Sequence, residues 1–202
     1  MGKISAIDIK KLWYTDCISS ALTPAALLAL VGKRKGIGGV TEETTGTATE
    51  ILNVHQDTWQ IDEGEATQDS YRNQLTGHVY RLGKRQMGDL TVNFTIGQYD
   101  YETKAALMGG DMLKSTGAVT TTASEAVGWQ RSNDVVEMYK TLIALTVDDV
   151  YVVISRSSLG ARESSTDGAI GMAMSGTMTD PTSTGVSAEY WYDCATVNAA
   201  SA

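Results

Sequence analysis

The chain is poor in cysteine, which limits what can hold its fold together. Cys17 and Cys194 are the only cysteines among 202 residues, too few for the disulfide framework of a small secreted domain. Two thiols near opposite ends of a chain are typical of reduced, partly buried cysteines, although a disulfide between them stays open. We therefore expect a hydrophobic core to stabilise the fold, and a chain of this length can bury one in a single domain.

Long apolar segments are also missing. The apolar run from Ala25 to Val31 is far shorter than the roughly 20 residues that cross a bilayer. Thr23, Pro24 and Gly32 have the properties of a helix N-cap, a first helical residue and a helix stop. This pattern predicts a short helix over 24–31 and no membrane anchor.

Positive charge is scarce as well. The chain has 16 basic and 24 acidic residues and a net charge of −8, which disfavours wrapping a nucleic acid through its phosphates. Asp8 and Asp16 interrupt the N-terminal region, and no clean apolar segment follows the early lysines. No signal peptide is therefore expected, and the chain is expected to fold in a cytoplasm.

Residues suited to catalysis are few. Only His55 and His78 offer imidazole bases, and the sequence has no G-x-S-x-G turn and no phosphate-binding glycine motif. A Cys17–histidine pair stays possible, but both histidines lie in strand-like polar stretches where ordinary hydrogen-bonded histidines are common. The acidic stretch 62–69 offers oxygen ligands for calcium without EF-hand spacing, so a solvated loop is favoured. We predict no enzyme, no cofactor and no metal site.

Charge is distributed in blocks of opposite sign. Residues 1–35 hold six basic and two acidic residues, whereas residues 36–70 hold eight acidic residues and no Lys or Arg. The segment 32–49 between them is rich in Gly and Thr, which indicates a long flexible loop. We predict an N-terminal extension at 1–48, with a short helix and a flexible charged loop, followed by an antiparallel β domain at 49–202.

The β domain is predicted from period-two alternation and from turn residues. Leu90, Val92, Phe94 and Ile96 alternate with polar residues, as in a strand with one buried face. Asp100 can cap a helix that follows at once, and Gly109 can end it. The remaining expected strands are 49–59, 75–85 (joined to 89–97 through a Gln86-Met87-Gly88 turn), 135–147 and 150–156 around Asp148-Asp149, 169–180 and 187–193.

The predicted strands define the fold class. We expect a mainly β fold, an antiparallel β-sandwich or barrel-like domain with one packed α-helix near 100–108 and a long N-terminal arm or loop. The strand at 169–180 carries a methionine stripe, which we interpret as core filling. Its members are Ile170, Met172, Met174 and Met178.

This organisation resembles the major tail tube protein of long-tailed bacteriophages and related injection tubes. The resemblance covers most of residues 50–194 and is one of organisation. The segments that carry it are the strand pair in "GHVYRLGKRQMGDLTVNFTIGQYD", the helix in "YETKAALMGG" and the hairpin in "EMYKTLIALTVDDVYVVISR".

The resemblance implies a virion protein that assembles in the host bacterial cytoplasm. Its subunits would form rings, usually hexamers, that stack into a tube, contact other tail proteins and pass DNA as non-specific cargo. Such tubes tend to have acidic lumens, and the net charge of −8 agrees with this.

Two candidate subunit interfaces follow from charge and from strand edges. The 142–147 and 150–154 stretches lack lysine, and the only prolines are at 24 and 181, so long strand edges would need neighbouring copies to cover them. We therefore predict Ile143 and Val152 at a subunit-to-subunit barrel. We also predict that Lys33, Arg34 and Lys35 of one copy meet Asp62, Glu63 and Glu65 of a neighbour.

Other function classes stay open at this point. A head-tail connector, a decoration protein or an adhesin would share a β-rich, self-associating chain. A small β-rich hydrolase whose acidic residues meet only in the fold is the remaining alternative. Ring formation would distinguish a tail tube protein from all of these alternatives.

Overall fold

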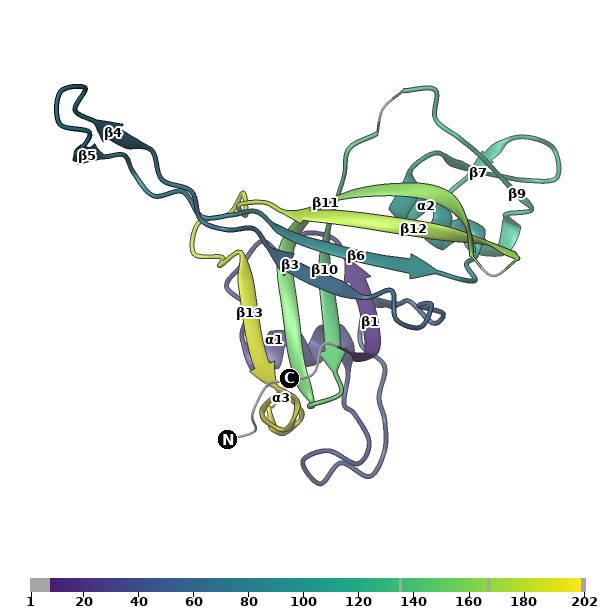
Figure 1. The fold of residues 1–202 in the computed structure, drawn as a ribbon. Coiled ribbons are helices and arrows are strands. Elements are labelled where there is room, and N and C mark those ends of the chain that lie inside the picture. Colours follow the sequence, from purple (N-terminus) through teal and green to yellow (C-terminus); the bar gives the residue numbers. More distant parts are fainter. Residues whose placement is uncertain (1–7, 135, 167, 201–202) are drawn as a thin grey trace.

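The computed structural model describes residues 8–134, 136–166 and 168–200. Within these residues the fold is mainly β, with one eight-stranded antiparallel sheet, two small sheets and three α-helices (Figure 1). The large sheet has the order β2-β1-β10-β11-β12-β6-β3, and β13 also pairs with β11. The predicted fold class is therefore confirmed.

The bounds of the elements are as follows. The large sheet contains β1 (Ile9–Thr15), β2 (Thr49–Glu50), β3 (Gln60–Glu63), β6 (Leu90–Ile96), β10 (Met138–Thr146), β11 (Val150–Thr166), β12 (Ala169–Met178) and β13 (Glu189–Asp193). The small sheets contain β4 (Ser70–Arg72) with β5 (Val79–Leu82), and β7 (Asp111–Leu113) with β8 (Val119–Thr120) and β9 (Gly128–Gln130). The helices are α1 (Pro24–Val31), α2 (Tyr101–Met108) and α3 (Cys194–Ala199), with a 3-10 turn at Ala123–Glu125.

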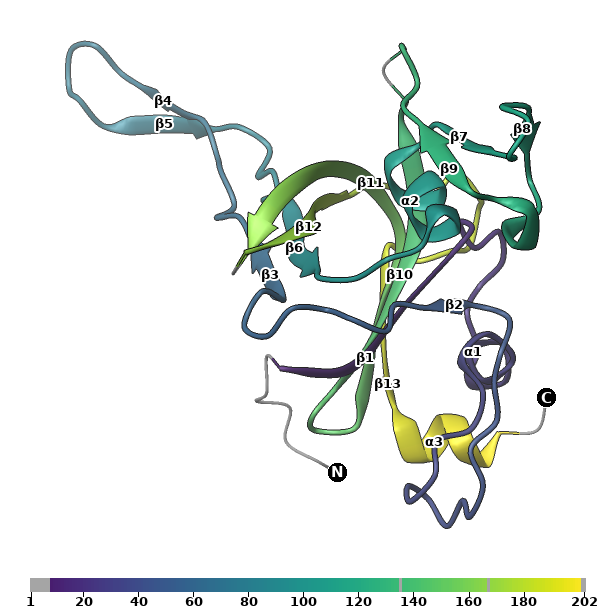
Figure 2. The ribbon, with the colours of Figure 1, turned by 90° about the vertical axis from the view of Figure 1, so that its right-hand side faces the viewer.

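The long strand β11 joins two layers that cross each other. Its first half lies between β10 and β13, and its second half pairs with β12. The layer of β12, β6 and β3 therefore runs across the layer of β1, β10 and the start of β11, and the sheet curls over in side view (Figures 1 and 2). This is the orthogonal form of a β-sandwich, in which one strand bends to serve both layers.

The main core fills the space between these layers. Phe94 of β6 and Met172 and Met174 of β12 lie in it against Leu142 and Ile154 of β10 and β11. The interpretation of the methionine stripe as core filling is thus confirmed for these two residues and for Met178, which is partly buried against the same cluster. Ile170 is the exception, because 71% of its side chain is exposed.

A second core lies on the other face of the β1–β10–β11 layer, under α1 and α3. Trp13, Ile143 and Tyr151 contribute from the sheet, and Leu27 and Val197 from the two helices. The predicted helix at 24–31 is confirmed together with its cap, since the Thr23 hydroxyl accepts the Ala26 N–H at 3.2 Å.

The N-terminal segment is part of the fold and not an extension of it. β1 lies between β2 and β10 in the large sheet. The loop that follows α1 folds back along this helix, where the Thr47 and Ala48 N–H groups donate to the Ala29 and Leu30 carbonyls at 3.1 and 2.8 Å. The expected separate extension and free loop at 1–48 are therefore wrong for residues 8–48. Residues 1–7 of that prediction lie outside the described residues.

Strands β3 and β6 continue beyond the sheet as a long hairpin, which we call the arm (residues 64–89). Its two sides are joined by the Thr67–Gln86 bridge and by β4 and β5, and it projects away from the body (Figures 1 and 2). The turn lies at 73–78, where the Asn73 N–H donates to the His78 carbonyl at 2.8 Å. The arm is an elongated two-stranded ribbon.

The arm corrects two predicted strands. The 75–85 segment contains β5, but β5 pairs with β4 and not with β6, so the predicted turn at Gln86-Met87-Gly88 is wrong. The strand that pairs with β6 on this side is β3, and not the predicted strand at 75–85. The predicted strand at 49–59 is limited to β2 and an isolated bridge at Val54. Register in a hairpin depends on where the chain turns, and this turn came earlier than expected.

Candidate subunit interface

The predicted basic patch is divided by burial. Lys33 and Lys35 are exposed, but Arg34 is only 5% exposed. Its guanidinium lies over the Trp13 ring, with 4.9 Å between Cζ and the ring centroid, and pairs with Glu43. Its backbone N–H donates to the Asn198 side-chain oxygen at 2.9 Å. Arg34 therefore fastens the loop to the body of its own subunit, which corrects its assignment to an intersubunit contact.

The predicted barrel residues are also internal. Ile143 is 0% and Val152 2% exposed. They lie on the β10–β11 hairpin, which forms around Asp148 and Asp149 as predicted and has Asp149 at φ 61. β1 covers the outer edge of β10, and β13 covers the start of β11. This hairpin is the centre of the sheet, so the assignment of Ile143 and Val152 to a subunit interface is corrected.

The predicted acidic residues stay on the surface. Asp62, Glu63 and Glu65 are exposed and lie where β3 continues into the arm. The arm and the loop that carries Lys33 and Lys35 extend from different ends of the molecule in both views (Figures 1 and 2). The structure does not bring these acidic and basic residues together within one subunit, and their meeting between copies stays a prediction.

The arm is the surface feature that the sequence patterns did not indicate. Every residue of β4 and β5 is exposed, including large apolar side chains that monomeric proteins usually bury. Leu75 at the tip is 94% exposed and Met87 79%. The other large apolar side chains exposed on the arm are Tyr71, Val79, Tyr80 and Leu82.

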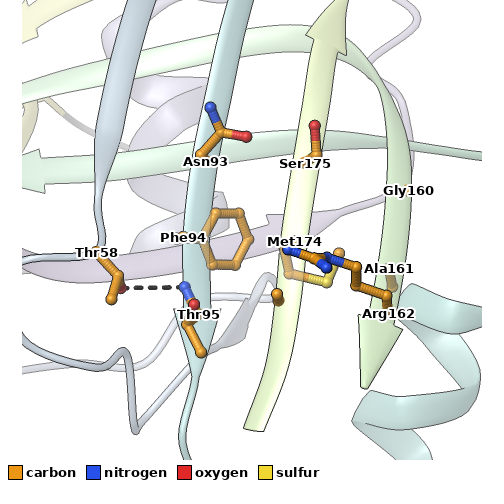
Figure 3. Close-up of a pocket in the computed structure, with 10 residues that line it drawn as sticks. Thr58, Asn93, Phe94, Thr95, Gly160, Ala161, Arg162, Met174 and Ser175 are labelled. Carbon is orange, nitrogen blue, oxygen red and sulfur yellow. Dashed lines mark hydrogen bonds between the residues drawn. The ribbon is translucent and has the colours of Figure 1, made fainter. Parts of the chain in front are cut away.

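The largest pocket described is a shallow trough on the face of β6, β12 and the second half of β11 (Figure 3). It has a volume of about 560 Å³ and is bordered by Asn93, Ser175 and Arg162. The Thr58 hydroxyl beside it accepts the Thr95 N–H at 3.0 Å and donates to the His55 carbonyl at 2.7 Å. These groups can hydrogen-bond a partner, but none of the described lining residues carries a carboxylate, an imidazole or a thiol.

The buried polar groups do not suit nucleophilic chemistry either. Burial raises the pKa of the Cys194 thiol and of the Tyr151 phenol, and it also raises the pKa of the Cys17 thiol. A thiol with a raised pKa has little of the reactive thiolate at neutral pH. Among the described residues, no group of three or more His, Cys, Asp or Glu residues is placed to hold a metal ion.

Comparison with known proteins adds no relative. No protein-family profile matches the chain, and no curated protein is similar to it. In the described part of the chain, no helix is long and apolar enough to cross a membrane.

Proposed function

We propose that the chain is a structural subunit that self-assembles into rings and stacks them into a tube, as the tail tube of a long-tailed phage does. In this role it would pass DNA as non-specific cargo and contact other tail proteins at the ends of the tube. The virion would be its final location. The proposal requires a surface built to contact further copies.

The observation that carries the proposal is the arm. A two-stranded hairpin is at best marginally stable in water on its own, because it has no second layer on which to bury side chains. Here the ribbon extends from the body with Leu75, Tyr80 and Leu82 exposed. Apolar side chains on a projecting hairpin are typical of a segment that another molecule covers. We infer that the arm is covered when the protein is assembled.

Unpaired sheet edges support the same inference. In the part of the chain that the structure describes, β3 pairs with β6 alone and β13 pairs with β11 alone. Open edges favour pairing with other chains unless they are protected. Trp191 on β13 adds an aromatic side chain that is 46% exposed beside one of these edges.

The resemblance to tail tube proteins selects tube formation among the possible assemblies. The helix directly after β6 and the β10–β11 hairpin match two of the three segments on which that resemblance was based, whereas the predicted strand pair does not form because β5 pairs with β4. The polar trough in Figure 3 offers hydrogen-bonding groups without an acid–base pair, so it favours a contact surface over a hydrolytic site.

Negative-stain microscopy and sedimentation velocity of the purified protein test the proposal. We expect rings or tubes whose amount rises with protein concentration. In a second protein, residues 65–88 are replaced by Asn-Gly, which can join Gly64 to Asp89 as a tight turn, because the Gly64 N–H already donates to the Asp89 carbonyl at 2.9 Å. This shortened protein should keep the melting temperature of the body and lose assembly.

Point substitutions provide a milder version of the same test. Changing Tyr80, Leu82 and Met87 on the arm to serine should weaken assembly. The matched control changes Val127 and Ile170 to serine, which are also exposed but lie off the arm. A wild-type protein that stays monomeric at high concentration would refute self-assembly. Discrete closed rings that never stack would instead favour a connector.

A further inference from the structure

The arm separates its charges along its length. The end of β3 and the base of the arm carry carboxylates, whereas the part of the arm beyond the Thr67–Gln86 bridge carries cations. The proximal carboxylates are Asp62, Glu63, Glu65 and Asp89, and the distal cations are Arg72, Arg81, Lys84 and Arg85. Asp69 is the exception, since it lies opposite Gly83 within the distal part.

The strand register places the two groups apart. Glu63 is opposite Leu90, whereas Tyr71 is opposite Arg81. With a rise of roughly 3.3 Å per residue, the centres of the two charge groups lie about 20 Å apart along the ribbon. This separation exceeds the screening length of about 8 Å at physiological salt. Arg72 and Arg81 are therefore screened from the carboxylates of their own arm, whereas Arg85, next to the Thr67–Gln86 bridge, lies nearer to Glu65.

Two of the distal cations, Arg72 and Arg81, contact residues of the arm itself. Arg81 lies over the Tyr71 ring, with 5.5 Å between Cζ and the ring centroid, and Arg72 donates to the Gly77 carbonyl at 3.2 Å. No ion pair joins the proximal carboxylates to a basic side chain among the residues described. Both charge groups are thus exposed and available to another molecule.

We propose that the arm is a polar connector between copies, in which the basic distal part of one arm lies on the acidic base of the next copy. This inference rests on the proposed self-assembly and names the contact that directs it. The acidic base adjoins the open edge of β3, so an arriving strand would find unpaired backbone groups beside complementary charge.

A second copy is the occupant that the charges favour. The cationic and the anionic surfaces are on one chain, are exposed and have four named side chains each, so each copy provides both halves of the contact. Exposed Leu82 and Met87 lie beside the distal cations and can supply the apolar part of the interface. The distal part of each arm would then contact one neighbour, and the base of the same arm would contact another neighbour. In a reciprocal dimer, both parts would contact the same partner.

Two charge-reversed proteins test this contact. The distal variant carries Arg81→Glu, Lys84→Glu and Arg85→Glu, so the net charge of its distal part becomes negative, like that of the base. The proximal variant carries Asp62→Lys, Glu63→Lys and Glu65→Lys, so the net charge of its base becomes positive, like that of the distal part. Arg72 is kept in both because it bonds to the turn. Each variant alone should associate at least tenfold more weakly than the wild type at low salt, with an unchanged melting temperature.

Mixing provides the decisive measurement. In a 1:1 mixture, the acidic distal part of the distal variant can meet the basic base of the proximal variant, and the basic distal part of the proximal variant can meet the acidic base of the distal variant. Co-assembly should therefore return to within a few-fold of the wild type. Added salt should weaken wild-type assembly and assembly of the mixture alike. A third variant, Lys33→Glu with Lys35→Glu, tests the other basic residues predicted to meet Asp62, Glu63 and Glu65. It should assemble like the wild type if the arm cations are the partner, and blocked assembly would overturn the arm contact.

The outcomes separate this inference from the proposed function. Wild-type assembly with both variants assembling equally well alone would overturn the charged contact and leave self-assembly standing. Blocked variants that do not recover on mixing would also overturn it, because the charges would then act on some other surface or partner. A wild type that never assembles would overturn both proposals.

Discussion

The guanidinium of Arg34 lies over the indole ring of Trp13, 4.9 Å from its centroid, and joins the loop after α1 to the strand β1. Asn198 of α3 completes the junction, since its side-chain amide donates to the Arg34 and Ile37 carbonyls, both at 3.0 Å. Three segments that are distant in the sequence meet at Arg34, β1 through its guanidinium and α3 through its backbone. In the basic run Lys33-Arg34-Lys35, the middle residue is therefore buried and structural, whereas the two lysines are exposed to solvent.

Substituting Arg34 tests this role. Arg34→Ala should lower the free energy of unfolding by about 1–3 kcal/mol, because it removes the stacked cation and opens the cover of Trp13. Arg34→Lys should recover only part of the loss, since an ammonium lacks the planar stacking surface. Urea unfolding measures both. Lys33→Ala is the control and should change stability by less than about 0.5 kcal/mol. Equal stability of all three variants would contradict a structural role.

The central position of the β10–β11 hairpin gives a second prediction. Ile143→Lys or Val152→Lys should unfold the subunit and not merely block assembly, because each introduces an unpaired charge into a site at most 2% exposed. Loss of more than about 4 kcal/mol, seen as insoluble or unfolded protein, is expected. Val147→Lys is the matched control, since Val147 is 45% exposed beside the same turn. If the Ile143→Lys and Val152→Lys proteins are folded and monomeric, these residues lie at a subunit interface and not in the core.

The strands that could be predicted from the sequence carry local signals. β6 alternates strictly between buried and half-buried residues, and α2 has its cap at Asp100 and its stop at Gly109 as expected. β1 was missed because Leu12, Trp13 and Tyr14 are all buried, so the strand shows no alternation. Its two faces serve two different cores, which only the packed structure reveals.

The arm and the interface residues could not be predicted for a different reason. The pairing of β4 with β5 depends on where the chain turns, and neither strand has a buried face that would fix its register. Charge runs indicate sign but not burial, so Lys33, Arg34 and Lys35 looked equivalent. The acidic residues at the base of the arm form a visible block in the sequence. The basic residues farther along the arm could be related to that block only once both were placed on one ribbon.

Helix α2 provides a test of packing between the layers. Leu107 is 0% exposed in the main core, so Leu107→Asp should cost several kcal/mol, about 3–5, by burying an unpaired charge. Lys104 on the same helix packs against β9, since its ammonium lies 4.1 Å from the centroid of the Trp129 ring and 2.6 Å from Glu163. Exposed Glu102→Ala is the control. A Leu107→Asp protein that melts like the wild type would show that α2 is not packed.

The cap of α2 gives a pH-dependent prediction. The Asp100 carboxylate accepts the Thr103 N–H at 2.7 Å, and this hydrogen bond holds the pKa of Asp100 below its usual 3.8. Because the folded-state pKa is the lower one, the carboxylate stabilises the fold above pH 3.8, and this contribution is lost as the pH falls through the folded-state value.

Asp100→Asn isolates this contribution. The asparagine oxygen can still cap the helix, but it has no charge to favour the N-terminal end of the helix dipole and no proton to bind. The wild type should be more stable than Asp100→Asn by up to about 1 kcal/mol near pH 7, and the difference should shrink as the pH falls below 3.8 and through the folded-state pKa. Urea unfolding of both proteins between these pH values measures it. A difference that stays constant across the range would mean that the charge of Asp100 does not contribute to the cap.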